Sequence, residues 1–433
     1  MGNDSVGEKE PNDHVIKIWQ VDKERLTSME ENIADSPRIL RRSAGKSCCC
    51  IFRVPQSLVE VNGRCYQPYV VSIGPYHHGD PRLRMIEEHK WRFLGSLLKR
   101  IESKGLKLKD LLESVHPLES KARECYSANI NFSTDEFIEI LVLDGCFVIE
   151  LFRKFGGIIP FEADDPLLSL DLIRIENQIP FFVLECLFDL TLMPGEESGP
   201  NLSTLTFKFF NNSFYRPEEF FYKFRDLKGK HLLDLLRTSF IPEGYEEPRQ
   251  SKYTNTHVIP CISKLRRAGI RLKPTGKDES FLAIRFRHRA LEMPTITIDD
   301  FMSSFLLNCV AYEQCHRHCS KHMTTYATFL SCLINTAKEV QYSCDMNIIE
   351  NYVGTDAEIA MFINNLGKDV SFDIEMCYLS ELFNEVEHYY MNSWHVQWAS
   401  FRYTYFNLAA FVLLVLTVAQ TTFTILGYVR PPP

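Results

Sequence analysis

The chain has 433 residues, of which 45% are hydrophobic and 24% are charged, so it can bury a substantial core as one large domain or two smaller ones. Its formal net charge of −8 argues against nucleic acid as a partner. The 14 cysteines are scattered among apolar residues without the spacing of a disulfide framework, and we expect them to be reduced.

The first 44 residues are polar, mixed in charge and interrupted by Pro11 and Pro37. This composition predicts a flexible N-terminal arm over residues 1–44, with one short helix near residues 19–33. The first thirty residues contain no apolar run of signal-peptide length. We therefore expect no co-translational export of the chain.

Short extended runs follow residue 50, namely IFRVP, SLVEV and RCYQP, and Asn62-Gly63 separates the last two. Asn-Gly favours a type I′ turn, in which both central residues need positive φ, so the sequence predicts an antiparallel hairpin. A helix is predicted next over residues 83–103, from a stripe of positions spaced four apart. The stripe consists of Met85, His89, Phe93, Leu97 and Ile101.

The core is predicted around residues 133–190. The sequence STDE at 133–136 has the pattern of a capping box, and the helix that starts there carries Asp144 on its apolar stripe. Pro180 removes a backbone donor, so ENQIP should break the chain between a helix from about residue 167 and another over residues 181–190. The carbonyls left free by this break invite the side-chain donors of Asn177 and Gln178.

The buried carboxylates have two interpretations. Asp144 with Asp171 or Glu176 has the residue types of an acid–base pair in an enzyme of unrecognised type. The structural alternative is that Asp144 pairs with Arg174 and fixes the packing of two helices, because an unpaired buried charge costs several kcal/mol. We favour the structural interpretation and predict an Asp144–Arg174 ion pair.

A basic segment follows a polar, proline-broken stretch at residues 242–256, which is typical of a disordered loop. Residues 264–289 carry a local net charge of +7. Within FLAIRFRHR, alternation places three apolar side chains on one strand face and Arg285, Arg287 and Arg289 on the other. This pattern is typical of a solvated face that protects a sheet edge, and the alternative is a docking surface for anionic lipid or an acidic partner.

The segment CVAYEQCHRHCSKH gathers the residue types that ligate metals. On one helix Cys315, Cys319 and His322 would share a face at i, i+4 and i+7, which is compatible with three zinc ligands. The segment lacks a paired C-x-x-C hook and a clear fourth ligand. We therefore predict no metal and no cofactor, and keep these three residues as the zinc candidate.

Residues 403–429 contain no Asp, Glu, Lys, Arg or His. This composition predicts a transmembrane helix over residues 405–428, with a juxtamembrane helix at 392–404 before it and a short tail at 429–433 after it. The lipid bilayer is thus a predicted partner, and a tail anchor inserted after synthesis would leave the bulk of the chain in the cytosol.

A polar stripe runs along this predicted span, because Thr417, Gln420, Thr421 and Thr424 are spaced i, i+3, i+4 and i+7. Such a stripe favours self-association or contact with another span through side-chain hydrogen bonds. The alternative is that the threonines bond to carbonyls of their own helix and need no partner.

Several motifs, taken together and in order, resemble the plant domain of unknown function 247 family. They are SIGPYHHGDPRLRMIEEHKWRFL, LDGCFVIELF, IRIENQIPFFVLECLF, HLLDLLRTSF, AYEQC and the apolar C-terminal segment. The resemblance implies a plant protein, with a single membrane span in most members and no established catalytic activity. Some grass members resemble determinants of self-incompatibility between pollen and stigma.

These observations predict a mainly α fold. A large helical domain over residues 45–391 should include a small antiparallel β element built from residues near 51–73 and 270–298. The favoured function is a membrane-anchored, non-catalytic protein-interaction or recognition module. The alternative is an enzyme that uses the buried carboxylates or the His and Cys residues.

Overall fold

The computed structural model describes residues 22–34, 46, 48–159, 166–248, 250, 257–276, 279–391 and 408–429. Within these ranges the chain is mainly helical with small sheets, as the sequence predicts. Most of the predicted arm, the predicted juxtamembrane helix and the residues after 429 lie outside the described ranges.

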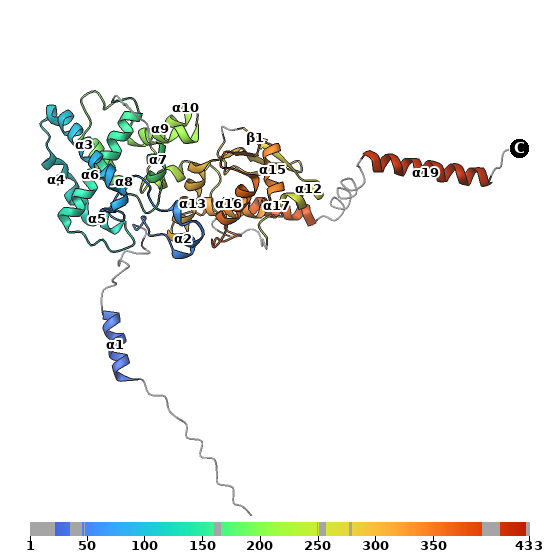
Figure 1. Cartoon of the computed structure of the whole chain (residues 1–433), viewed down its shortest axis with the longest axis horizontal. Helices are drawn as coiled ribbons and strands as arrows, with labels where there is room; N and C mark the ends of the chain where they lie inside the picture. The colour runs from blue at the N-terminus through green and yellow to red at the C-terminus, as the bar shows by residue number, and fades with distance from the viewer. Residues whose placement is uncertain are drawn as a thin grey trace, which may run out of the picture.

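The helices are α1 (Lys23–Ala34), α2 (Gln56–Asn62), α3 (Arg84–Ile101), α4 (Leu108–Val115), α5 (Glu119–Glu124), α6 (Thr134–Phe155), α7 (Pro166–Leu172), α8 (Phe181–Leu190), α9 (Leu202–Phe214), α10 (Glu218–Lys223), α11 (Leu232–Thr238), α12 (Ile262–Arg267), α13 (Asp300–Cys315), α14 (His322–Leu333), α15 (Ala337–Asp345), α16 (Asp356–Leu366), α17 (Ser380–Met391) and α19 (Leu408–Val429). The strands are β1 (Arg271–Thr275), β2 (Arg285–Arg287), β3 (Ala290–Pro294), β4 (Ile296–Ile298) and β5 (Ile349–Asn351). Figure 1 shows an elongated body with α3, α4 and α6 at one end and the sheet, α12 and α17 at the other.

Helix α6 is the centre of the N-terminal half. Ser133 Oγ accepts the Glu136 N–H at 3.3 Å, and Glu136 Oε2 accepts the Ser133 N–H at 2.8 Å, so the predicted capping box is confirmed. The helix is buried on nearly all sides from Phe137 onward, and its buried residues include the ionisable Asp144, Glu150 and Arg153. Helices α3, α4, α8 and α9 pack around it.

The predicted hairpin near Asn62-Gly63 is wrong. Residues Gln56–Asn62 form α2, and Gly63 continues into a 3-10 turn with φ of −50°, so the turn needs no positive φ. Ile51 makes only an isolated bridge to Tyr126. A helical turn that buries Leu58 therefore replaces the strand, and the β element receives no residues from 51–73.

The β element lies in the second half of the chain, where the prediction placed its other part. Strand β3 is central in a sheet of order β1-β3-β2; it pairs with β1 in parallel and with β2 antiparallel, and β4 pairs in parallel with β5. The antiparallel expectation thus holds only for β2 and β3. Their two-residue turn is formed by His288 at φ 50° and Arg289 at φ 61°, where bulky residues cost about 1–2 kcal/mol each.

Helix α3 confirms the predicted helix over residues 83–103 but faces the core differently. Met85 is 78% exposed, and the buried positions are Lys90, Leu94, Leu97 and Ile101. The predicted stripe is therefore wrong in its first turns. It missed the inward position of Lys90 because a lysine does not count as a core residue in a hydrophobic pattern.

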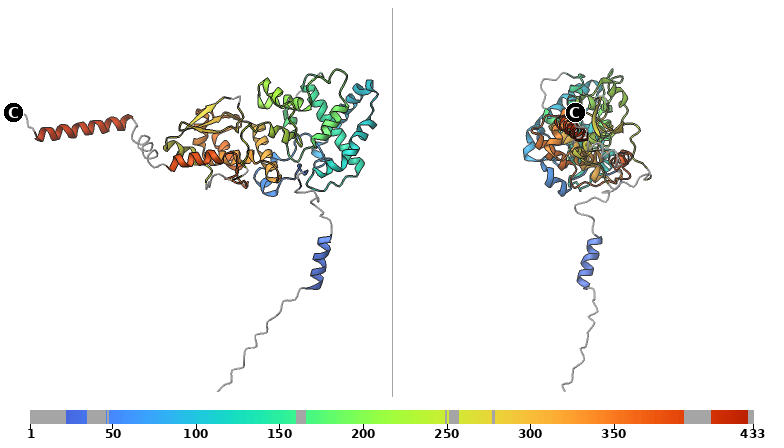
Figure 2. Two further views of the ribbon diagram at one scale, coloured as in Figure 1. Left: turned by 180° about the vertical axis from the view of Figure 1, so that it is seen from behind. Right: turned by 90° about the vertical axis from the view of Figure 1, so that its right-hand side faces the viewer.

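Helix α13 has the central role in the C-terminal half, where α11, α14, α16 and β4 contact it. Buried apolar side chains from Cys49 to Val386 form one continuous cluster that joins both halves. Figure 2 shows this body from behind and from its end. Within the described ranges, none of the helices combines the length and apolar character needed to cross a bilayer, so the transmembrane part of the predicted fold is not supported.

Candidate functional site

The Asp144 carboxylate lies at the contact between α6 and α3. Its Oδ1 accepts a hydrogen bond from Lys90 Nζ at 2.6 Å, and its Oδ2 accepts the Gly74 N–H at 2.7 Å. Lys90 is fully buried and also donates to Glu87 at 2.6 Å and to the Ser72 carbonyl. Burial raises the pKa of Asp144, and the Lys90 ammonium opposes that shift. The predicted Asp144–Arg174 pair is therefore wrong, and Lys90 is the partner.

Asp171 holds the Arg174 side chain instead. Arg174 Nε lies 3.0 Å from Asp171 Oδ1, and its guanidinium stacks 4.4 Å from the centre of the Tyr69 ring. The Asp171 carboxylate also accepts three successive backbone N–H groups, those of Tyr69, Val70 and Val71, at 2.6–3.0 Å. These bonds fasten the bent segment at 69–71 to the end of α7.

Glu176 holds another N-terminal segment, at Arg53 and Val54. Its carboxylate accepts hydrogen bonds from Arg53 Nη1 and from the Val54 N–H, both at 2.8 Å, and His77 Nε2 lies 3.3 Å away. Burial acts to raise the pKa of Glu176, but the hydrogen bonds from His77, Val54 and Arg53 outweigh it, so the pKa lies below its usual value. The three carboxylates are thus each bound by donors of the protein itself.

The ENQIP segment forms the predicted break before Pro180. Gln178 Nε2 donates to the Leu172 carbonyl at 2.7 Å, and Asn177 Nδ2 donates to the Asp171 carbonyl at 3.1 Å, as predicted for the carbonyls at the end of the preceding helix. Helix α8 then runs over Phe181–Leu190, as predicted. Gly74 packs against the Gln178 carbonyl with φ of 78°, where a side chain would collide.

The zinc candidate does not assemble on one helix. Helix α13 ends at Cys315, Cys319 lies in the following loop, and His322 is the first residue of α14. His322 Nε2 contacts the Tyr245 carbonyl at 2.6 Å, and its ring stacks on Tyr378. Among the described residues, no group of three His, Cys, Asp or Glu side chains could hold a metal ion.

The basic residues lie on β2 and in the turn after it. Arg285 pairs with Glu279 at 2.9 Å, while Arg287 and Arg289 are exposed. In the preceding stretch, Tyr245 Oη accepts a hydrogen bond from Arg285, and Glu247 accepts the Lys321 N–H, so residues 242–248 are fixed by contacts. Residues 249 and 251–256 of the predicted disordered loop lie outside the described ranges.

The threonines of α19 follow the alternative that needs no partner. Thr417 donates to the Leu413 carbonyl, Thr421 to that of Thr417 and Thr424 to that of Gln420, at 2.7–2.8 Å. Self-association through this stripe stays a prediction.

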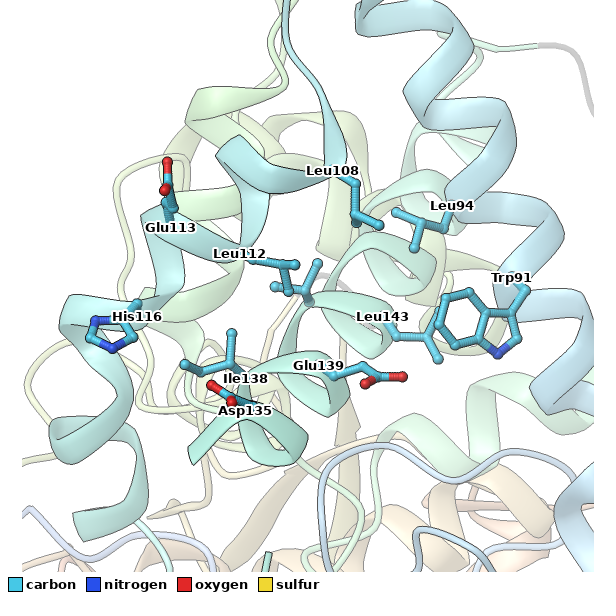
Figure 3. A pocket seen from close by; sticks show the side chains of 11 residues that line it. Trp91, Leu94, Leu108, Leu112, Glu113, His116, Asp135, Ile138, Glu139 and Leu143 are labelled. Atoms are coloured by element: carbon cyan, nitrogen blue, oxygen red, sulfur yellow. The ribbon is translucent and has the colours of Figure 1, made fainter. Parts of the chain in front are cut away.

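An apolar groove opens between α3, α4 and α6 (Figure 3). Its volume of about 460 Å³ is within the range of ligand-binding pockets. Two large apolar side chains at the groove remain unusually exposed, Trp91 at 49% and Leu108 at 38%. The remaining apolar lining comes from Leu94, Leu112, Ile138, Val142 and Leu143.

The polar side chains at this groove are mostly acidic. Glu113, Asp135 and Glu139 line it together with His116, and all four are exposed. Glu113 has a cation nearby, since Lys109 Nζ lies 3.5 Å away. We call this feature the acidic groove, defined by the residues named in this paragraph and the previous one. Sequence reasoning missed it because its walls come from three separate helices; the only signal was a tryptophan off the buried face of α3.

The comparisons place this chain within a class of plant proteins. Residues 51–423 match the DUF247 family, described as "Plant protein of unknown function". UPF0481 protein At3g47200 of Arabidopsis thaliana is 35% identical over 446 residues, which cover 92% of each chain. Putative UPF0481 protein At3g02645 of the same plant is 23% identical, covering 80% of this chain and 83% of the relative. The chain therefore belongs to this family of unknown function. No solved structure matches it.

Proposed function

We propose that this protein is a non-catalytic recognition module whose acidic groove binds a short apolar segment of a partner protein. The observation that carries the proposal is the groove itself, an apolar hollow of about 460 Å³ with carboxylates of Glu113, Asp135 and Glu139 around it. An apolar side chain can enter such a hollow while a Lys or Arg of the same segment meets a carboxylate. The expected partner is thus an amphipathic segment with cations beside its apolar residues.

The state of the buried carboxylates supports recognition over the enzyme alternative. A general acid or base must be able to reach a substrate proton. Asp144, Asp171 and Glu176 instead bind backbone N–H groups and the cations of Lys90, Arg174 and Arg53. This is the arrangement expected of carboxylates that fix chain segments in place.

A membrane tether through residues 405–428 is part of the proposal. It is proposed from the sequence of residues 405–428, which has no charged residue; the described part of this segment, α19, does not by itself combine the length and apolar character of a bilayer-crossing helix. Leu413, Leu416 and Phe423 are each more than 60% exposed. Covering such apolar side chains with lipid or a partner is favourable, because it removes apolar surface from water. The bulk of the chain is proposed to face the cytosol. Asn131 and Asn201 each begin an Asn-x-Ser glycosylation sequence, so glycosylation of either in expressed protein would contradict that.

The groove and the C-terminal end of the body lie far apart. In Figure 1, α3, α4 and α6 form one end of the body, and α17, the last described helix before the proposed tether, lies at the opposite end. A tethered chain could therefore present the groove away from the membrane, toward partners in the surrounding solution.

Peptide selection tests the groove. Full-length protein in detergent would be used to select a displayed random-peptide library, and the selected peptides should combine apolar residues with Lys or Arg. Trp91→Ala and Glu139→Lys should each weaken these peptides by at least about fivefold, since central aromatic and charged contacts exceed about 1 kcal/mol. The matched control is Met85→Ala, which removes a 78% exposed side chain of the same helix outside the groove. Equal binding by wild type and both groove variants would disprove the proposal.

A further inference from the structure

We propose that the turn between β2 and β3 is a contact surface for anionic lipid headgroups. We call Arg287, His288 and Arg289 the basic turn; all three are exposed. The inference rests on the proposed membrane tether and adds a second, charge-dependent contact at the other end of the body from the acidic groove. Three independent observations carry it: the charge of the turn, its backbone conformation and its position.

The cations of the basic turn are less neutralised than their neighbours. Arg285 is paired with Glu279, and Lys273 with Glu292 at 2.7 Å. Glu292 and Glu385 lie near enough to Arg287 to interact with its charge, and Glu381 and Glu387 are also on α17. Among the described residues, however, no carboxylate is within ion-pair distance of Arg287 or Arg289. Arg271 is exposed at the start of the adjoining strand β1 and adds a further cation. Its backbone N–H donates to the Arg289 carbonyl, so the two arginines are neighbours.

The backbone of the turn is held in a conformation that its residues disfavour. His288 and Arg289 have φ of 50° and 61°, and Asn-Gly is the usual sequence for such a turn. Strained backbone of this kind is concentrated at functional sites. Arg289 here places its charge at the turn of the hairpin, next to Arg287 on β2, which an Asn-Gly turn would not do.

The turn is fixed to the helix that leads toward the proposed tether. The Phe286 and Tyr389 rings pack with their centres 5.8 Å apart, and Arg289 lies 5.9 Å from the centre of the Tyr389 ring. Only residues 392–404 separate α17 from the predicted span. If that span is in a bilayer, the basic turn belongs to the end of the body nearest the headgroups, where each cation contributes to attraction by an anionic surface.

The test uses full-length protein in nanodiscs of phosphatidylcholine, with and without phosphatidylserine, and hydrogen exchange of the peptide covering residues 285–291. We expect slower exchange with phosphatidylserine and loss of the difference at high salt. His288→Asn/Arg289→Gly keeps the hairpin as an Asn-Gly turn and should reduce the protection about fivefold, the effect of one cation at the surface. Lys208→Gln removes an exposed cation of α9 and should leave the protection unchanged.

The outcomes separate this inference from the tether. If the chain is not retained in either kind of nanodisc, the tether is wrong and the lipid contact falls with it. If the chain is retained but exchange over 285–291 does not depend on phosphatidylserine, only the lipid contact is wrong. Protection by added polyglutamate in neutral nanodiscs, without an effect of phosphatidylserine, would instead show that the basic turn binds an acidic protein.

Discussion

Two groups of carboxylates in the N-terminal half differ in what surrounds them. Asp144, Asp171 and Glu176 are buried and accept backbone N–H groups from segments far away in the sequence; the cations of Asp144 and Glu176 are also distant, whereas that of Asp171 is the nearby Arg174. Asp135 and Glu139 are exposed beside an apolar hollow. The comparison teaches that burial alone does not mark a functional acid: the buried group holds the fold together, and the exposed group is the one that a ligand can reach.

The largest expected effect comes from Lys90→Met. The substitution leaves the Asp144 carboxylate buried without its cation, so the free energy of unfolding in urea should fall by about 3–5 kcal/mol. Lys90→Met/Asp144→Asn should lose less than the sum of the two single variants, because the two groups are coupled. Additive losses would show that the pair contributes little as a pair.

Asp171→Asn should cost about 2–3 kcal/mol, because it leaves the Arg174 guanidinium buried without an anion and weakens the bonds from residues 69–71. Hydrogen exchange of the Val70 and Val71 amides should accelerate more than exchange across α14, which serves as the internal reference. Unchanged exchange at residues 69–71 would mean that the carboxylate does not hold this segment.

The contribution of Glu176 to stability depends on pH. The pKa of Glu176 lies below its unfolded value of about 4.5, so its contribution to stability is complete above that pH and is lost as the pH falls through the folded-state pKa. Glu176→Gln should cost about 1–3 kcal/mol at neutral pH. The difference from wild type should shrink below pH 4.5, and a difference that stays constant on acidification would contradict the ion-paired state.

The smallest expected effect on stability is at the acidic groove. Glu139→Gln alters an exposed side chain and should change the free energy of unfolding by no more than about 0.5 kcal/mol, while Trp91→Ala, at a side chain that is 49% exposed, should cost about 1–2 kcal/mol. Thermal unfolding of the full-length variants checks this. A large loss from Trp91→Ala would mean that the groove is part of the packed core, and the contrast between the two groups of carboxylates would disappear.

Features that depend on neighbouring residues could be predicted from the sequence. The capping box at 133–136 and the break before Pro180 each follow from a few consecutive residues, and the structure contains both. The donors Asn177 and Gln178 were identified because the carbonyls they satisfy lie within six residues. Even here, local signals have limits: Asn62-Gly63 is a strong turn signal, yet Gly63 adopts a helical conformation equally well.

Features that depend on distant segments could not be predicted. The partner of Asp144 is 54 residues away on α3, and a hydrophobic pattern assigns a lysine to the surface. The acidic groove requires the relative placement of three helices, which periodicity along the chain does not contain. The zinc candidate failed for a related reason, because the pattern assumed one continuous helix where the structure has two helices and a loop.

The hydrogen bonds between Asp171 and residues 69–71 can form only late in translation. The Tyr69 N–H and its acceptor are 102 residues apart, so the acceptor leaves the ribosome well after the donor. At translation rates of about 5–20 residues per second, the segment waits roughly 5–20 s before its partner exists. During that interval Val70, Val71 and Ile73 lack the partner that fixes them in the folded chain, so we expect this apolar stretch of the nascent chain to be accessible to chaperones.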